Sequence, residues 1–249
     1  MTTPSRVLVL AGSDSSGGAG IQADIKTITM LGGYAMTAIT AITAQNTTGV
    51  QVVEVLSPEM VVSQAQSCID DIGVDAVKIG MLGSPAVAHA VADLLEGVHA
   101  PIVFDPVMVS TSGSVLADAD TIAAFERLMA MAAITTPNVP ELDALGGVKA
   151  LQERGITFLA KGGDAPGDTV TDRLYRPGED VLDWAAPRIE TRHTHGTGCT
   201  TASAIACGLG AGLGMVPAIE QARAFVRAAL EAAPGFGAGH GPLGHQAVR

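Results

Sequence analysis

The stretch His193-Thr-His-Gly-Thr-Gly-Cys-Thr-Thr-Ala-Ser-Ala204 joins a polar loop to a long segment of small, apolar residues. Gly196 and Gly198 let the backbone turn tightly, and the alanine-rich run after Cys199 favours a helix. A helix that begins there directs several unpaired backbone N–H groups out of the loop, and such a helix end attracts anions, phosphate above all. The stretch therefore predicts an anion-binding helix N-terminus, whose site needs further residues from the rest of the chain.

Short apolar runs and helical patterns alternate along the chain on the N-terminal side of this stretch. Serine followed by proline marks two of the helix starts, at Ser57-Pro58 and Ser84-Pro85. Strands are predicted at 6–11, 34–44, 50–56, 76–80, 101–105, 133–136 and 156–160, and helices at 21–31, from 57, at 84–95 and at 117–131. This alternation implies right-handed βαβ crossovers and an α/β sandwich, with a mostly parallel sheet between two layers of helices.

The remaining segments complete one domain over residues 1–249. An antiparallel hairpin is predicted at the sheet edge from strands at 169–175 and 181–185, which are separated by Arg176-Pro-Gly-Glu-Asp180. A final helix is expected at 217–232, and the glycine- and histidine-rich tail from 234 is expected to be irregular. No internal repeat or linker divides the chain.

The amino-acid composition narrows the range of possible functions. With 249 residues, 47% of them hydrophobic and 16% charged, the chain can bury a large core. A net charge of -11, a pI of about 4.8 and the lack of a lysine and arginine cluster argue against nucleic-acid binding. The partner should be a small molecule, and an anionic one must be held by local N–H groups, a lysine and a metal ion.

Three features bear on the location of the protein. The first ten residues carry one arginine and an apolar run too short for a secretory signal. A membrane helix could be sought at 200–219, but its apolarity comes mostly from alanine and glycine, and Pro217 interrupts its end. Cys68, Cys199 and Cys207 are odd in number and widely spaced, which argues against a disulfide framework. We therefore expect a cytoplasmic protein with no membrane partner.

Ligands of open α/β sheets bind at the carboxyl ends of the strands. In this chain that rule selects the loops that begin at Gly12, Gln45, Gly80, Asp105, Pro137 and Lys161. Each loop carries residues suited to handling a phosphate donor and an aromatic acceptor.

The loops at Asp105, Pro137 and Lys161 carry side chains that could meet a metal ion or a phosphate. Asp105 follows Ile-Val-Phe directly and could hold Mg²⁺, or it could be a solvated strand-end carboxylate. Asn138 and Glu141 lie three residues apart on a proline-rich turn, where they could face one ligand, cap a helix, or do both. Lys161 precedes Gly162 and Gly163 and suits phosphate contact, although a surface lysine at an ordinary turn would look the same.

Cys199 has a second interpretation of its own. At a helix N-terminus the dipole favours a thiolate, which predicts that Cys199 is more reactive than Cys68 or Cys207. Alternatively, it is a small residue that fills the junction between loop and helix. Nucleophilic catalysis with His195 as base is a third option, but it leaves Asp105 and the other charged loops without a role.

Other ligand motifs fit the chain less well. No Gly-x-x-x-x-Gly-Lys-Ser/Thr sequence occurs, which excludes a P-loop kinase. Gly18-Ala-Gly-Ile-Gln-Ala23 matches a dinucleotide fingerprint, but the loop before it is too long and the next strand lacks a ribose-binding acid. His193, His195 and Cys199 could bind zinc, but a fourth ligand at a typical spacing is lacking.

Taken together, the motifs resemble hydroxymethylpyrimidine/phosphomethylpyrimidine kinases of thiamine biosynthesis, in the ribokinase-like superfamily. The resemblance covers nearly the whole chain in the same order. It rests on Ala11-Gly-Ser-Asp-Ser-Ser-Gly-Gly-Ala-Gly-Ile-Gln-Ala-Asp-Ile-Lys-Thr27, Lys78-Ile-Gly-Met-Leu82, Asp105-Pro-Val-Met108, Thr136-Pro-Asn-Val-Pro-Glu141, Lys161-Gly-Gly163 and Thr194-His-Gly-Thr-Gly-Cys-Thr200. It implies a ribokinase-like three-layer sandwich and a homodimer.

The resemblance also implies an activity and a site. The activity is the ATP- and Mg²⁺-dependent phosphorylation of 4-amino-5-hydroxymethyl-2-methylpyrimidine, and then of its monophosphate to the diphosphate. The implied pyrimidine pocket consists of Gly12, Ala19, Asp24, Gln45, Met81 and Val107. The metal ion would be held by Asp105 and Glu141. The nucleotide would be bound by Asn138, Lys161, Gly163 and Thr197. The catalytic residues of the transfer would be Gly196, Thr197, Gly198, Lys161 and Cys199, with Cys199 as the base.

Two departures from the family and two rival functions follow from the comparison. Asp164 stands where the family commonly has histidine, and the 142–155 connection looks short enough to have lost helical structure beside the nucleotide. Some members of this branch phosphorylate pyridoxal-type alcohols, so a pyridoxal kinase or a dual-specificity kinase is the nearest rival. A ligand-binding regulatory domain is the non-kinase alternative, which the Asp105, Glu141, Lys161 and Cys199 set argues against.

Overall fold

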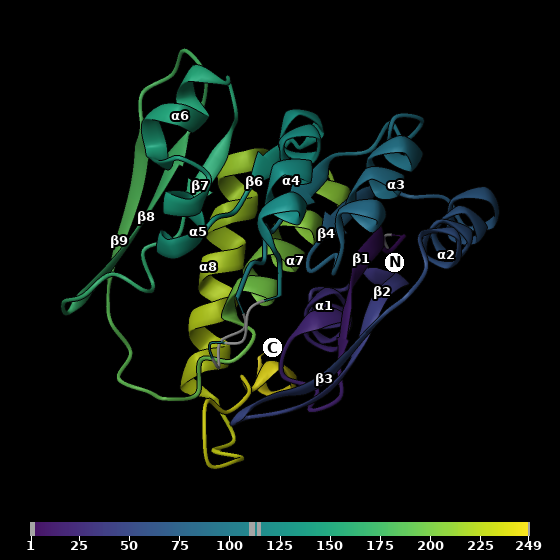
Figure 1. The fold of residues 1–249 in the computed structure, drawn as a ribbon. Helices are drawn as coiled ribbons and strands as arrows, with labels where there is room; N and C mark the ends of the chain where they lie inside the picture. The colour runs from purple at the N-terminus through teal and green to yellow at the C-terminus, as the bar shows by residue number, and fades with distance from the viewer. Residues whose placement is uncertain (1–2, 110–112, 114–115, 249) are drawn as a thin grey trace.

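The computed structural model describes residues 3–109, 113 and 116–248, and in this part of the chain nine strands form one sheet (Figure 1). The strand order is β3-β2-β1-β4-β5-β6-β7-β8-β9. The strands are β1 (Arg6–Asp14), β2 (Tyr34–Asn46), β3 (Gly49–Val55), β4 (Ala76–Ile79), β5 (Ile102–Phe104), β6 (Ile134–Thr135), β7 (Phe158–Ala160), β8 (Thr169–Tyr175) and β9 (Leu182–Pro187). In this spatial order, the neighbouring strands β2, β1, β4, β5, β6 and β7 all pair in parallel, which confirms the predicted mostly parallel sheet.

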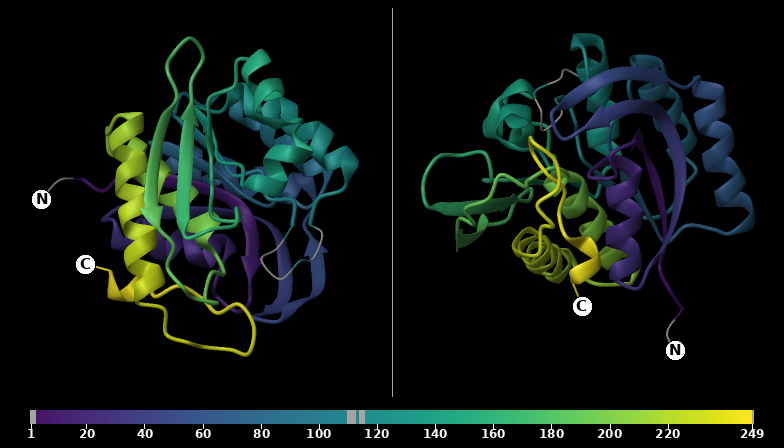
Figure 2. Two further views of the ribbon diagram at one scale, coloured as in Figure 1. Left: turned by 90° about the vertical axis from the view of Figure 1, so that its left-hand side faces the viewer. Right: turned by 90° about the horizontal axis from the view of Figure 1, so that it is seen from below.

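Helices cover both faces of this sheet, as the two further views show (Figure 2). One layer packs α1, α7 and α8 against the sheet, and the other packs α2, α3, α4 and α6. The helices are α1 (Gly20–Met30), α2 (Pro58–Asp71), α3 (Pro85–Leu95), α4 (Ala119–Met131), α5 (Val139–Ala144), α6 (Gly147–Glu153), α7 (Thr197–Gly210), α8 (Met215–Glu231) and the short 3-10 helix η1 (His245–Ala247). Within the described residues, no helix has the length and apolar content needed to cross a membrane.

The helix starts follow the sequence signals. Ser57 caps α2 by accepting a hydrogen bond from Met60 N, and Ser84 caps α3 by accepting one from Val87 N. In each helix proline occupies the first turn, where its missing N–H leaves no bond unmade. These two helices therefore begin where the Ser-Pro pairs predict.

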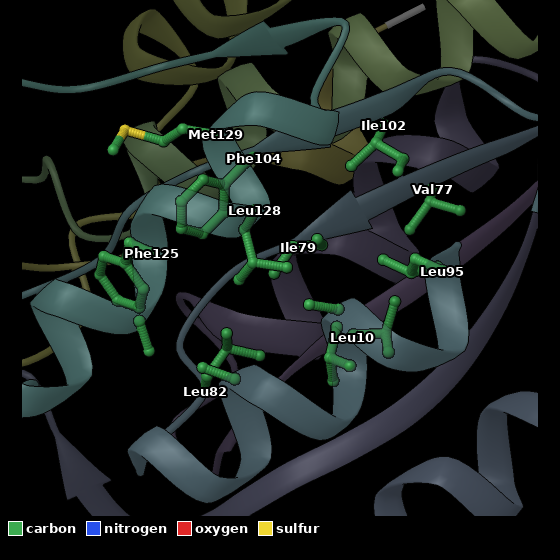
Figure 3. Packing of buried hydrophobic residues seen from close by; sticks show 14 of the residues in the cluster. Leu10, Val77, Ile79, Leu82, Leu95, Ile102, Phe104, Phe125, Leu128 and Met129 are labelled. Atoms are coloured by element: carbon green, nitrogen blue, oxygen red, sulfur yellow. The ribbon is translucent and has the colours of Figure 1, made fainter. Parts of the chain in front are cut away.

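Two apolar clusters, one on each face of the sheet, form the core. Leu10 on β1 packs into the cluster beneath α3 and α4, while Val9 on the same strand packs toward α1 and α7. In the first cluster the rings of Phe104 and Phe125 meet edge to face with centroids 5.1 Å apart (Figure 3). Strand β1 is therefore buried on both faces and lies at the centre of the core that supports the site.

The structure corrects the sequence prediction in three places. The 142–155 connection has not lost helical structure, since α5 and α6 occupy most of it. Gln45 and Asn46 extend β2 instead of starting a loop, because they pair with β3. That pairing is antiparallel, so the sheet has a second antiparallel edge that was not predicted, besides the expected β8–β9 hairpin.

The tail after 234 is mostly irregular, as predicted, but it is packed against the rest of the molecule. His240 N donates to Thr47 O at 2.9 Å, which ties the tail to the β2–β3 turn. Further along, His245 is fully buried and its Nε2 lies 2.8 Å from Thr200 Oγ1 in the first turn of α7. The tail thus supports two elements that border the site (Figure 1).

Candidate active site

A cavity of about 840 Å³ lies at the carboxyl ends of the parallel strands. Residues that follow four neighbouring strands line it, as the strand-end rule predicts. Of the predicted site residues, those in its wall are Gly12, Ala19, Gln45, Met81, Asp105, Val107, Asn138, Glu141, Lys161, Gly163, Gly196, Thr197, Gly198 and Cys199. The structure therefore brings fourteen of the fifteen predicted positions to one cavity.

Asp24 is the exception, and its predicted place in the pyrimidine pocket is wrong for this structure. Its side chain is fully buried on the core face of α1 instead of lining the cavity. There it accepts hydrogen bonds from Lys78 Nζ at 2.9 and 3.0 Å and from Ser203 Oγ at 2.6 Å. Asp24 thus neutralises a buried lysine, which explains why a carboxylate is tolerated there.

The predicted anion-binding loop has the required backbone. Gly196 has φ of 92°, and a Cβ at this position would collide with the Gly18 carbonyl oxygen, so only glycine fits. Helix α7 begins directly afterwards at Thr197, and among the described residues no side chain caps it. Thr197 N donates to Thr194 O at 3.3 Å, so the N–H groups of Gly198 and Cys199 are the ones in this first turn that are available to an anion.

Gly198 brings this loop close to two charged side chains. A Cβ on Gly198 would lie 3.3 Å from Lys161 Nζ and 3.5 Å from Asp105 Oδ2. The start of α7, the end of β7 and the end of β5 therefore converge on one point of the cavity. A lysine and free N–H groups at that point can neutralise a phosphoryl group.

Asp105 is held in a fixed position. Its Oδ1 accepts hydrogen bonds from Lys161 Nζ at 2.8 Å and from Thr136 Oγ1 at 2.9 Å. Burial by itself would raise the pKa of Asp105, but the charges of Lys161 and Lys78 outweigh it, so the pKa lies below its ordinary value. Asp105 is therefore an ionised carboxylate with Oδ2 turned toward α7.

Asn138 and Glu141 cap a helix, as one of the two interpretations predicts, and they lie where the other interpretation needs them to meet a ligand. Asn138 Oδ1 accepts from Glu141 N at 2.9 Å and Glu141 Oε2 accepts from Asn138 N at 2.8 Å, which is a complete capping box at the start of α5. Both side chains also line the cavity. Burial, together with the nearby Asp105 charge and against the pull of Lys161, raises the pKa of Glu141 to about 7.

The thiol of Cys199 differs from the sequence-based expectation. Although Cys199 lies at the helix N-terminus and is only half-buried at the cavity wall, dense packing around its thiol raises its pKa to about 11. The positive charge of Lys78 opposes this shift but does not overcome it. At neutral pH Cys199 is therefore a thiol, so the predicted thiolate is not the resting state.

One part of the cavity wall is largely apolar. Gly12 packs directly on the methyl end of Met81, because a Cβ at Gly12 would lie 2.4 Å from Met81 Cε in the present arrangement. Val107 and Ala19 line the same wall, and the half-buried Gln45 adds an amide. These residues suit a flat heteroaromatic ring with one polar edge.

Sequence reasoning missed several residues that hold the site together. Asp14 was quoted only inside a motif, yet it caps the loop that contains Ala19 and contacts His195. Lys78 also went unassigned, because nothing local reveals that a strand lysine is fully buried. The Gly-Ser-Asp-Ser-Ser-Gly run was a usable signal for Asp14, since aspartate often binds the backbone N–H groups of such a turn.

The zinc interpretation finds no support in the geometry. Among the described residues, no three histidine, cysteine, aspartate or glutamate side chains come together as a metal site. His195 Nε2 is instead 2.8 Å from Asp14 Oδ2.

Comparisons with known proteins agree on a family. The family model described as phosphomethylpyrimidine kinase matches residues 14–244. The chain is 44% identical to a hydroxymethylpyrimidine/phosphomethylpyrimidine kinase of Streptomyces coelicolor, over 98% of this chain and 95% of that protein.

Solved structures agree on the fold. The phosphomethylpyrimidine kinase of Clostridium difficile 630 is 34% identical, with a TM-score of 0.76 over 89% of this chain and 97% of that one. The pyridoxal kinase of Staphylococcus aureus in complex with AMP-PCP and pyridoxal is 30% identical, with a TM-score of 0.88 over 99% of this chain and 95% of that one. The predicted ribokinase-like sandwich is thereby confirmed.

Proposed function

The chain belongs to the phosphomethylpyrimidine kinase family, and from this premise we propose that it makes the pyrimidine precursor of thiamine. It transfers a phosphoryl group from ATP to 4-amino-5-hydroxymethyl-2-methylpyrimidine, and a second one to the resulting monophosphate. The observation that carries the proposal is the convergence of Lys161, Asp105 and the glycine loop before α7 in one cavity, which Met81 and Gln45 also line.

The geometry supports transfer by positioning and charge neutralisation. Phosphoryl transfer passes through a loose transition state, so a fixed geometry and neutralised charge matter more than a strong base. The N–H groups that open α7 and the ammonium of Lys161 face the place where negative charge develops. Cys199 is the proposed base for the substrate hydroxyl. Its pKa of about 11 keeps a proton on the thiol at rest, so it accepts the substrate's proton only in the small fraction of molecules that hold a thiolate.

The residues present fit a magnesium ion. Asp105 Oδ1 already accepts two hydrogen bonds, while among the described residues its Oδ2 has no donor, and Glu141 uses only Oε2 in its capping box. Mg²⁺ takes one or two carboxylates together with the phosphates and water. Bound by Asp105 and Glu141, it would neutralise charge on the nucleotide phosphates. The space left for that nucleotide is bordered by Asn138, Gly163 and Thr197.

A second candidate is a pyridoxal kinase. The similarity to the Staphylococcus aureus enzyme with bound pyridoxal favours it, and pyridoxal is also a heteroaromatic methanol. Sequence identity favours the pyrimidine kinases, at 44% against 30%. A purely ligand-binding domain has no use for the ionised Asp105, Lys161 and the open helix end together.

The proposed activity is tested with three acceptors. Purified protein is incubated with ATP, Mg²⁺ and either the hydroxymethylpyrimidine, its monophosphate or pyridoxal, and products are identified by mass spectrometry. We expect turnover of both pyrimidines, and Lys161→Met serves as the inactive control. Turnover of pyridoxal alone, or of the first pyrimidine alone, contradicts the two-step assignment.

Two further properties belong to this proposal. A cytoplasmic location is supported by the use of ATP, the nucleotide whose analogue occupies the Staphylococcus aureus relative. A homodimer is supported by the exposed apolar side chains of the edge strand β3, among them Val52 and Val53.

A further inference from the structure

A largely buried pair, Asp14 and His195, lies in the wall of the same cavity, beside Gln45. His195 is 4% exposed and Asp14 is 3% exposed, and His195 Nε2 lies 2.8 Å from Asp14 Oδ2. The same Nε2 atom lies 3.3 Å from the terminal amide of Gln45, a residue of the cavity wall. The pair therefore contacts the amide assigned to the pyrimidine pocket.

The direction of the Asp14–His195 hydrogen bond is fixed by the surroundings of Asp14. Its carboxylate also accepts from Ser16 N at 2.8 Å, Gly18 N at 3.0 Å and Ala19 N at 2.8 Å. Burial would raise the pKa of Asp14, but these bonds and His195 hold it at about 2. An ionised carboxylate only accepts, so Nε2 of His195 must carry the hydrogen.

This direction fixes the Gln45 amide as well. A nitrogen that donates to Asp14 cannot accept from Gln45, so the atom that Gln45 turns to His195 must be its oxygen. Amide oxygen and nitrogen occupy almost the same space, and hydrogen-bond counting decides between the two orientations. The structure places Gln45 Nε2 toward His195 and Oε1 toward Thr43 Oγ1, at 3.1 Å, and hydrogen-bond counting exchanges these two atoms. After the exchange the amide N–H donates to Thr43 Oγ1, whose own hydroxyl donates to Ser13 O at 2.9 Å.

We infer that Asp14 and His195 are positioning residues that lock the Gln45 amide in one orientation and so select the amino–imino edge of a 4-aminopyrimidine. This inference rests on the proposed function. After its bonds to His195 and Thr43, the amide keeps one oxygen lone pair and one N–H for a ligand. A 4-aminopyrimidine offers the complement, an exocyclic N–H donor beside a ring-nitrogen acceptor.

The 4-oxo counterpart, 5-hydroxymethyl-2-methylpyrimidin-4-one, presents the reversed pattern, with a carbonyl acceptor beside a ring N–H. A locked amide must reject it, whereas an amide free to turn by 180° can accept either ring. The ratio of the two dissociation constants therefore reports the lock directly, without any need for turnover.

The experiment measures both dissociation constants by isothermal titration calorimetry for the full chain and its variants. We expect the wild type to prefer the amino compound at least about tenfold, the range given by one correctly paired amide edge. His195→Leu should bring the ratio close to one, and His195→Gln, which restores an N–H near the Nε2 position, should recover most of it.

Two further variants keep the test decisive. Thr43→Val removes the partner on the other side of the amide and should also lower the ratio, so it answers the question if His195→Leu does not fold. Ser15→Ala is the matched control, because Ser15 Oγ contacts only the backbone of Gln45, at 2.9 and 3.0 Å. It should leave the preference unchanged.

The outcomes separate this inference from the proposed function. An unchanged ratio in folded His195→Leu or Thr43→Val, or no preference in the wild type, overturns the lock even if the protein is an active pyrimidine kinase. A preference that depends on His195 in a protein without turnover supports the lock while the proposed kinase activity fails. Absence of binding of both rings overturns both.

Discussion

At the scale of single residues, burial decides chemistry that position alone suggests differently. Cys199 lies at the start of α7, a position that favours a thiolate, yet dense packing around the thiol raises its pKa to about 11. The dipole effect is worth at most about 2 kcal/mol, and desolvation of a buried charge exceeds it. Cys199 is therefore suited to handling one proton late in the reaction and not to standing as a nucleophile.

Replacement of Cys199 tests this role. We expect Cys199→Ala to lower kcat by about 100-fold or more, the usual contribution of proton transfer, with little change in the KM for the pyrimidine. The half-buried Cys68, which lies on α2 away from the cavity, provides the control as Cys68→Ala. Steady-state kinetics with equal rates for wild type and Cys199→Ala would remove Cys199 from the reaction.

Glu141 makes stability depend on pH in a direction opposite to that of an ordinary paired carboxylate. Its pKa is about 7 in the folded chain and about 4.5 when unfolded. Between these values the folded state keeps a proton that the unfolded state has released, so the free energy of unfolding falls as pH rises from about 4.5 to 7.

Glu141→Gln should remove this fall, because the amide stays uncharged at every pH. The free energy of unfolding of the variant, minus that of the wild type, should increase by on the order of 1–3 kcal/mol when the pH rises from 4.5 to 8. Urea unfolding at the two pH values measures the difference, with the exposed Glu153→Gln as control. Parallel curves for wild type and Glu141→Gln would show that burial does not perturb this carboxyl.

At the scale of elements, the β8–β9 edge holds the loop that carries Lys161. Asp172 on β8 accepts a hydrogen bond from Gly162 N at 2.9 Å, and Arg188, just after β9, donates to Gly163 O at 2.7 Å and Gly167 O at 2.6 Å. The loop is thus fixed through its backbone. This explains how Asp164 can replace the histidine common in the family, because the side chain there is exposed and the loop does not depend on it.

Arg188→Met should therefore loosen the loop without touching the reacting atoms. We expect the KM for ATP to rise about three- to tenfold while kcat changes less, because a displaced loop weakens binding of the nucleotide more than it disturbs the reacting atoms. Arg173→Met on the exposed face of β8 is the matched control. An unchanged KM would mean that the hairpin alone orders the loop.

At the scale of the whole molecule, the two edges of the sheet differ. The β8–β9 edge packs β9 toward α8, whereas β3 at the other edge exposes Val52, Val53 and Val55 at 60%, 40% and 38%. An uncovered apolar edge strand invites pairing with another chain. The proposed homodimer would cover this edge.

Light scattering after size exclusion tests the dimer. We expect a mass twice the 25.1 kDa of the chain, and a shift toward the monomer in the Val52→Lys, Val53→Lys double variant. Val181→Lys, which changes an apolar residue that is 45% exposed beside β9, is the control. A monomeric wild type at tens of micromolar would contradict the dimer.

The sequence by itself determined most of the strands and helices and the mostly parallel sheet, because local periodicity, Ser-Pro starts and glycine turns leave little choice of local structure. The family followed from the resemblance of six ordered motifs. The strand-end rule selected the loops of the site, and the resemblance to the family then named the fourteen residues that line the cavity. Only the tertiary structure decided that Asp24 is buried against Lys78, that Cys199 keeps its proton, and that Asp14 meets His195 beside Gln45. These outcomes depend on desolvation and on contacts between residues up to 181 positions apart, and neither is written in any local stretch of the chain.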